Sequence, residues 1–308
     1  MKLHITKIKI YIFFLLIGVL AGIITHCINP GHLMRNQNLI LGSLEVGETL
    51  IQLFKEYDHE FAPKEEYFIG RSVAAFLITE TRIDLYSEDK NTPLDDYINK
   101  IGHTLVKASD RPGTYQGYRF IVAKSKRVNA YAVPSGFIFI TTGLINLCEN
   151  EDELAGVLAH EISHIVLKHP TKSIEEYRKA KAIAGLIKTA SSSALSSERG
   201  LGRLTNMFGD IISEVRESVL NGYNSAKEKE ADLQAVELLV RAGYNPRALS
   251  SVLRKLKVGG GVHGDPSVRA DQVDRQAKRK GIKGRQIASI KRVRTRRFNQ
   301  IIHLSDIR

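Results

Sequence analysis

The strongest chemical signal in the sequence is the run His160-Glu161-Ile162-Ser163-His164, an HExxH pattern. Residues four apart on a helix share one face, so the imidazoles of His160 and His164 can bind one zinc ion. Glu161 would then lie beside the ion without being a ligand, where a general base can take a proton from water. Solvated histidines on an amphipathic helix are the alternative. Apolar residues surround the pattern, and a buried His-Glu-His group needs a partner, which favours zinc.

A third ligand must come from another part of the chain, because the residues after HExxH lack the glycine and histidine of a metzincin. The downstream run from Lys227 to Asp232 places Glu228 and Asp232 one turn apart on a predicted helix. Glu228 can therefore bind zinc while Asp232 accepts a hydrogen bond from a ligand imidazole. Ser225 to Glu228 also fits a capping box, in which Glu228 would bond to the backbone. The need of the histidines for an anionic third ligand favours the metal.

The elements that position these residues follow from the pattern of apolar residues, caps and breakers. Asn150 is a predicted N-cap for the HExxH helix, and Gly243 ends the helix of Glu228. The remaining pattern predicts helices from Glu65 to Leu77 and from Leu94 to Lys107, with strands at Tyr118–Ala123, Asn129–Val133 and Phe137–Thr141. We therefore expect an α+β domain, mostly helical, with a small β-sheet beside the HExxH helix.

Charge is concentrated at one end of the chain. The 308 residues carry a formal net charge of +12, and residues 275–308 hold twelve Lys or Arg against Asp306 alone, a balance of +11. The rest of the chain is nearly neutral, so we treat this segment as a basic tail, either solvated or bound to anionic lipid. It lacks interleaved aromatic residues apart from Phe298, so we expect no nucleic-acid partner.

The N-terminus resembles an export signal. Lysines at positions 2, 7 and 9 precede an uncharged apolar run of sixteen residues, Ile10 to Thr25. This run predicts a signal peptide or a membrane anchor over residues 1–27. Cys27 lies where a bacterial lipoprotein cysteine would lie, so acylation there is a further alternative. No other stretch is apolar enough to meet a bilayer, which excludes a protein with several spans.

Several motifs in order resemble the gluzincin family of zinc peptidases that includes HtpX, the CAAX prenyl endopeptidases and the periplasmic protease BepA. Besides HExxH and the Glu-x-x-x-Asp pair, the segment Asn129 to Ile138 is similar to the strand and turn before the family's zinc helix. His263 and Arg269 match its late His-to-Arg pair. The resemblance covers about residues 62 to 270. The single apolar segment makes the exported, BepA-like branch the closer match.

The resemblance implies a zincin-type domain with one zinc ion per chain, held by His160, His164 and Glu228. It also implies that substrate peptides add in extended form to the strand that contains Asn129, Ala130, Tyr131 and Ala132. His263 and Arg269 would project over the site as further catalytic residues. Arg269 suits stabilisation of an oxyanion, whereas His263 could also bind zinc in a resting state.

The expected organisation is a signal peptide or anchor at 1–27, a spacer at 28–61, a zinc metallopeptidase domain at 62–274 and the basic tail at 275–308. The expected function is cleavage of misfolded or misassembled proteins at the bacterial cell envelope, either in the periplasm or attached to a membrane. The alternative is an envelope chaperone or assembly factor whose zinc site is closed by a fourth ligand such as His263. The sequence indicates no oligomeric state.

Overall fold

The computed structural model describes residues 60–80, 84–86, 92–177, 222–256, 264–280, 284–305 and 307. The chain divides into two compact units, residues 1–58 and 59–308, and all described residues belong to the second. The expected export segment with Cys27, nearly all of the expected spacer, and His263 lie outside the described residues.

The sheet has four strands in the order β1-β2-β4-β3. Strands β2 and β4 are parallel, whereas β1 and β3 pair antiparallel with β2 and β4. The short β3 forms one edge, with Ala130 opposite Ile140 and Val133 opposite Phe137 of β4. The strands are β1 (Asp84–Leu85), β2 (Arg119–Lys124), β3 (Ala130–Val133) and β4 (Phe137–Thr141). The three strands expected from the sequence are confirmed to within one residue, and β1 is an addition.

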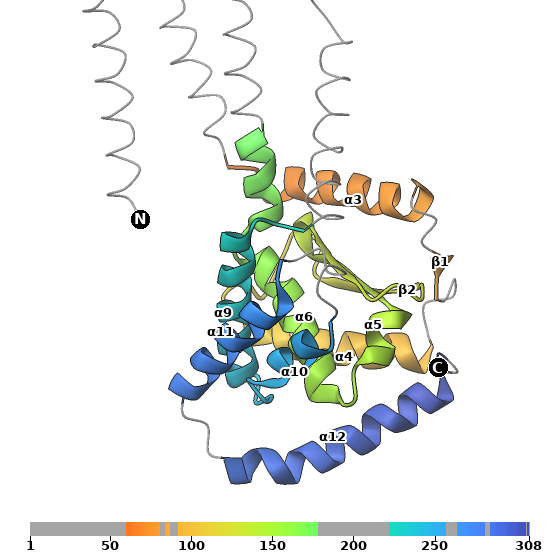
Figure 1. Ribbon diagram of the computed structural model, residues 1–308. Coiled ribbons are helices and arrows are strands. Elements are labelled where there is room, and N and C mark those ends of the chain that lie inside the picture. The colour runs from red at the N-terminus through yellow and green to blue at the C-terminus, as the bar shows by residue number, and fades with distance from the viewer. Residues whose placement is uncertain are drawn as a thin grey trace, which may run out of the picture. The chain divides into compact units, whose positions relative to one another are not determined.

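Helices cover both faces of the sheet (Figure 1). Side chains alternate along β4. Phe137 and Phe139 pack with helix α3 (Pro63–Glu80), whereas Ile138 and Ile140 join the larger core on the other face. That larger core is formed with helices α4 (Pro93–Lys107), α6 (Glu151–Val166), α9 (Ser225–Arg241), α10 (Ala248–Lys255), α11 (Pro266–Arg279) and α12 (Gly284–Leu304). The expected α+β, mostly helical fold with a sheet beside the HExxH helix is therefore confirmed.

Helix α6 is the centre of this layer and is buried along its length. The side chain of Asn150 accepts a hydrogen bond from the Glu153 backbone N–H at 3.1 Å, so the predicted cap forms. Gly156 lets α10 approach closely, because a Cβ there would lie 2.8 Å from the Leu249 backbone nitrogen. The HExxH residues are thus on a helix that can neither tilt nor slide without disturbing its neighbours.

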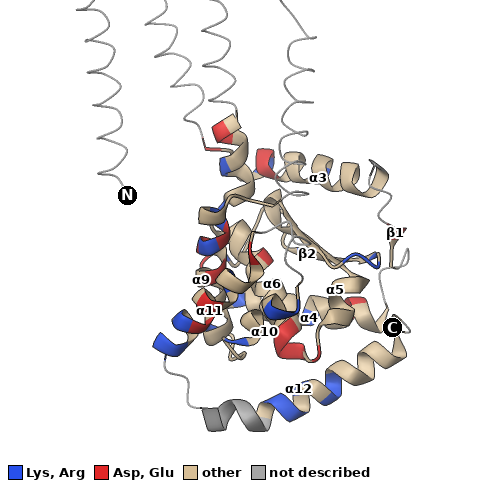
Figure 2. Cartoon of the chain, viewed as in Figure 1, with Lys and Arg blue, Asp and Glu red and all other residues tan. Residues whose placement is uncertain are grey.

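The basic C-terminal segment is helical and packed. Helix α12 runs along one side of the other helices (Figure 1), and its residues Phe298 and Ile302 are buried in the larger core. A short helix, α5 (Thr142–Leu147), connects β4 to the loop before α6. Acidic residues at the start of α6 and basic residues of α12 are visible in Figure 2, and Arg297 pairs with Glu151. Part of the basic charge therefore neutralises buried carboxylates inside the fold.

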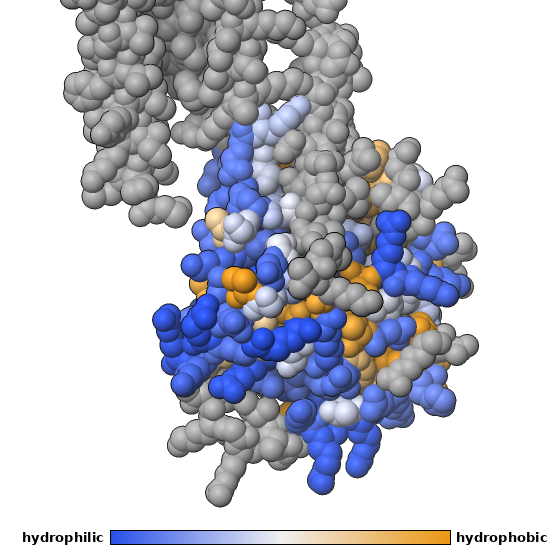
Figure 3. Space-filling model, viewed as in Figure 1, coloured by the Kyte–Doolittle hydropathy of each residue, from blue (hydrophilic) through white to orange (hydrophobic). Residues whose placement is uncertain are grey.

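The outer surface is polar over most of the face in Figure 3, and apolar side chains gather near its middle. Among the described helices, none combines the length and apolar character needed to cross a membrane.

Candidate metal centre

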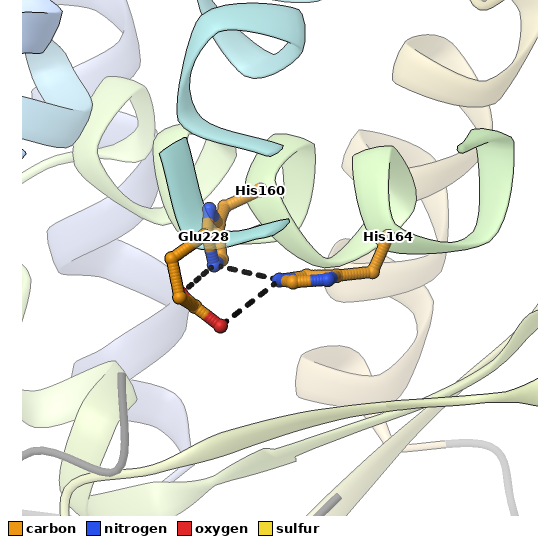
Figure 4. Close-up of side chains that lie close together, drawn as sticks. All are labelled: His160, His164 and Glu228. Atoms are coloured by element: carbon orange, nitrogen blue, oxygen red, sulfur yellow. Dashed lines mark hydrogen bonds and ion pairs between the residues drawn. The ribbon is translucent and has the colours of Figure 1, made fainter. Parts of the chain in front are cut away.

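His160, His164 and Glu228 come together from two helices that are distant in sequence (Figure 4). His160 and His164 lie on α6, and Glu228 lies on the neighbouring α9. The Nε2 atoms of the two imidazoles are 3.1 Å apart. The Glu228 carboxylate oxygens lie 3.4 Å from Nε2 of His160 and 3.7 Å from Nε2 of His164. All three side chains are buried.

This donor set fits zinc. Four ligands arranged as a tetrahedron, with bonds of about 2.1 Å, lie about 3.4 Å from one another. The three separations between the ligand atoms, 3.1, 3.4 and 3.7 Å, bracket that value. Two imidazoles and one carboxylate are also the donor set of many catalytic zinc sites, which keep a position open for water or substrate.

The local sequence explains how Glu228 reaches the site. The side chain of Asn224 caps α9 by accepting from the Lys227 backbone N–H at 3.0 Å, so Asn224 and not Ser225 is the N-cap. Glu228 lies one turn into the helix, where Oε1 also accepts from the Tyr223 backbone N–H at 3.3 Å. The carboxylate thus contacts both the backbone and the imidazoles, and zinc binding by Glu228 stays a prediction.

Asp232 holds the outer side of His160. Its Oδ1 lies 3.0 Å from Nδ1 of His160, and its two oxygens accept from Nε and Nη2 of Arg269 at 2.8 and 2.7 Å. Nη1 of Arg269 also lies 3.2 Å from Glu228. Arg269 therefore reaches the site from α11 as expected, but its guanidinium is engaged by two carboxylates of α9.

Electrostatics at the site reflect this crowding of buried charge. Burial alone would lower the pKa of His160, but its hydrogen bonds to Asp232 and Glu228 raise that pKa to about 9. Burial would raise the pKa of Asp232, yet the hydrogen bonds from Arg269 and His160 lower it. In the absence of metal, a proton on His160 thus compensates the carboxylates, and a bound cation can take over that role.

His164 has an outer partner that the sequence analysis did not assign. Its Nδ1 lies 2.9 Å from Nδ1 of His169, and Nε2 of His169 lies 3.3 Å from Glu230. Burial lowers the pKa of His169, although Glu230 opposes this effect. The spacing of HExxH to a histidine five residues later is a signal in the sequence, but it does not show that the two rings meet.

Tyr223 covers the other side of His164. Their rings stack with centroids 4.6 Å apart and planes at 28°. The Tyr223 hydroxyl is buried and makes no hydrogen bond with the part of the chain that the structure describes. Burial and the carboxylates of Glu161 and Glu228 raise the pKa of Tyr223, so its phenol stays neutral.

Glu161 is buried next to His160 on α6. Helix α6 packs directly against β3; burial raises the pKa of Tyr131 in that strand, and the charge of Glu161 adds to this effect. Asn129 precedes β3, and Ala130, Tyr131 and Ala132 are buried in it. The predicted base and the predicted substrate strand are therefore neighbours, while binding of a peptide to that strand stays a prediction.

The model of peptidase family M48 matches residues 93–290, which include every described residue of this centre. A beta-barrel assembly-enhancing protease of Escherichia coli K12 is 28% identical over 169 residues, or 54% of this chain and 33% of that protein. The protein of that name from Yersinia pestis is 28% identical over 53% of this chain and 32% of its own length. The mitochondrial metalloendopeptidase OMA1 of Arabidopsis thaliana is 28% identical over 60% of this chain and 36% of its own length. The matches thus span about a third of each relative.

Proposed function

Because this chain belongs to peptidase family M48, we propose that it is a zinc-dependent endopeptidase, with His160, His164 and Glu228 as the metal ligands. The observation that carries the proposal is the buried convergence of these three side chains beside Glu161. The names of the relatives, a protease and a metalloendopeptidase, support the same activity.

His160, His164 and Glu228 would hold the zinc ion, which would act as a Lewis acid to polarise a peptide carbonyl and acidify water. Glu161 takes the proton from the attacking water and passes it to the leaving amine, which lets one carboxylate serve both halves of the reaction. Asp232 keeps the proton of His160 on Nδ1, so that Nε2 faces the metal. Arg269 pairs with Asp232 and Glu228, and we propose that it also donates to the developing oxyanion.

The substrates we propose are unfolded or misassembled polypeptides that bind in extended form. Strand β3 is one of the two edge strands of the described sheet and lies beside α6. A peptide added there would be read mainly through its backbone, so selectivity for sequence would be low and selectivity for unfolded chain high.

We place this activity at the bacterial cell envelope. The apolar N-terminal run after three lysines supports export, and the names of the Escherichia coli and Yersinia pestis relatives refer to beta-barrel assembly. The intact mass of the native protein distinguishes three alternatives for residues 1–27, which are removal, retention as an anchor and acylation at Cys27.

The test is Glu161→Gln in the full chain. The amide keeps the shape of the carboxylate but cannot accept the proton, so casein hydrolysis should fall by orders of magnitude while one zinc ion per chain remains. Glu65→Gln, an exposed change in α3 on the opposite face of the sheet, is the matched control and should have wild-type activity. Undiminished hydrolysis by purified Glu161→Gln protein would overturn the proposed mechanism.

A further inference from the structure

The two predicted ligand imidazoles have the same orientation but different outer partners. Each turns Nε2 toward the other and toward Glu228, and each turns Nδ1 away. Nδ1 of His160 meets a carboxylate, whereas Nδ1 of His164 meets the imidazole of His169 at 2.9 Å. We propose that His169, held by Glu230, is a positioning residue that fixes the proton and the ring orientation of His164. This inference rests on the metal site of the proposed function.

Counting protons gives the pair of hydrogen bonds a direction. A neutral His164 that offers the Nε2 lone pair to a metal must carry its proton on Nδ1. That proton can be donated to His169 only if Nδ1 of His169 is a lone pair, so the proton of His169 is on Nε2. Nε2 of His169 lies 3.3 Å from Glu230, whose ionised carboxylate can only accept.

A hydrogen bond donated in the opposite direction, from His169 to His164, would prevent His164 from binding metal. If His169 donated from Nδ1, then His164 would carry its proton on Nε2, the atom that faces His160 and Glu228. No lone pair of His164 would then point into the centre. Glu230 is the final acceptor in the series of hydrogen bonds from His164 through His169. It thus selects the tautomer in which His164 can bind metal.

The fold builds this arrangement with a sharp turn at the end of α6. Lys168 has a φ of 58°, in the left-handed region, and it separates α6 from the helical segment that begins at His169, whose ring contacts that of His164. His169 is 1% exposed, and the Tyr223 ring lies 5.8 Å from it as well as against His164. His169 therefore has little freedom to rotate. The Glu230 side chain is 62% exposed, so its contribution is smaller.

Two amide substitutions separate the two nitrogens of His169. An Asn side chain places its oxygen near the position of Nδ1 and can accept from His164, whereas a Gln side chain reaches the position of Nε2 and leaves Nδ1 without a substitute. His169→Asn should therefore keep zinc affinity within about threefold of wild type, and His169→Gln should lose about tenfold or more. His169→Phe fills the ring volume without either nitrogen and should lose as much as His169→Gln.

The readout is zinc affinity of the full chain, measured by competition with a colorimetric chelator, and thermal unfolding of the zinc-free protein measures packing separately. Glu230→Ala, a change at an exposed side chain, should weaken zinc by about two- to fivefold. Lys229→Ala, next to it on the exposed surface of α9, should leave the affinity unchanged.

The results distinguish this inference from the proposed function. Wild-type protein that binds no zinc would overturn both. Wild-type protein that binds zinc, together with equal affinities of the Asn, Gln and Phe variants, would overturn only the role of His169. If the His169 variants do not fold, equal zinc affinity of Glu230→Ala and Lys229→Ala has the same consequence.

Discussion

At the scale of single residues, Arg269 is the permanent positive charge beside the buried carboxylates Asp232 and Glu228. It makes two hydrogen bonds to Asp232 and an ion pair to Glu228, and both partners are buried. A guanidinium suits this place because its planar fork matches a carboxylate. The same side chain therefore supports the ligand helix and remains a predicted donor to the oxyanion.

Arg269→Ala should lower the unfolding free energy of the zinc-free protein by about 3 kcal/mol, because Asp232 would be left buried without its partner. Arg269→Lys should recover only part of this loss, since an ammonium cannot form the paired hydrogen bonds. Urea unfolding of the three proteins at one pH measures the difference. A change below about 0.5 kcal/mol in Arg269→Ala would contradict the compensating role.

The pKa of His160 is raised to about 9 from an ordinary 6.5. As the pH rises, the stability of the zinc-free protein should therefore fall, whereas the affinity for zinc should increase. Without metal, the protonated ring stabilises the fold fully below the ordinary pKa, and this contribution is lost as pH rises through the raised one. Zinc competes with that proton, so its affinity should increase by up to about tenfold per pH unit up to the raised pKa.

Chelator competition between pH 6.5 and 9, corrected for protonation of the chelator, measures this slope. Asp232→Asn removes the carboxylate that holds the proton on His160 and should flatten the slope in the upper part of the range. Zinc affinity that is constant over the whole range would contradict a proton on His160.

At the scale of elements, the end of α6 stores a small strain. Lys168 adopts a left-handed φ of 58° although it has a side chain, and its backbone N–H donates to Ile165 at 3.1 Å. Glycine adopts this conformation without the steric penalty. Lys168→Gly should therefore raise the unfolding free energy by up to about 1 kcal/mol.

The measurement is urea unfolding of zinc-free protein, with Lys172→Gly in the helical segment 169–177 as the control. Glycine inside a helix should destabilise by about 1 kcal/mol, so the two substitutions are expected to have opposite signs. Destabilisation by both would show that the Lys168 side chain matters more than its backbone conformation.

Local patterns predict the elements well where the determining residues are close in sequence. The strand Phe137–Thr141 has the expected bounds, and Asn150 caps α6 as its position before three acidic residues indicates. Ligand spacing on α6 and α9 is also local, because one helical turn fixes it. The contact between α6 and α9 depends on residues far apart in the sequence. Only the chemical need of two histidines for an anionic ligand predicts it.

The contact between His169 and Glu230 was not predictable in this way. On a helical wheel Glu230 points away from Glu228 and Asp232, so the sequence indicates a residue outside the site. In the structure its side chain nevertheless reaches His169, because the turn at Lys168 brings that ring against α9. A backbone conformation that a lysine rarely adopts is not signalled by the residue itself.

At the scale of the whole molecule, the basic C-terminal segment has two kinds of positive charge. Arg294 and Arg297 pair with Asp152 and Glu151 at the start of α6, and Phe298, which follows Arg297, is buried. Other basic residues of α12 are exposed, namely Lys291, Arg292 and Arg296. A count of charges along the sequence does not separate the paired basic residues from these exposed ones. Deletion of residues 275–308 would also remove part of the hydrophobic core.

The lipid hypothesis is therefore better tested by reversing exposed charges than by truncation. Changing Lys291, Arg292 and Arg296 to Glu should weaken binding to vesicles that contain phosphatidylglycerol, most strongly at low salt, and leave peptide hydrolysis unchanged. A control with the same change in net charge reverses three exposed residues elsewhere, Lys64, Arg71 and Lys107. Equal vesicle binding by both triple variants would reject α12 as the lipid surface.

The assembly of the centre from α6, α9 and α11 has a consequence for when the protein becomes active. His160 and Arg269, which lie 3.3 Å apart at closest approach, are separated by 109 positions in the chain. During synthesis the HExxH helix is complete long before its carboxylate ligand and its arginine have been made. An unfolded chain carries the motif without the site. Proteolysis should therefore begin only after the three helices have folded together.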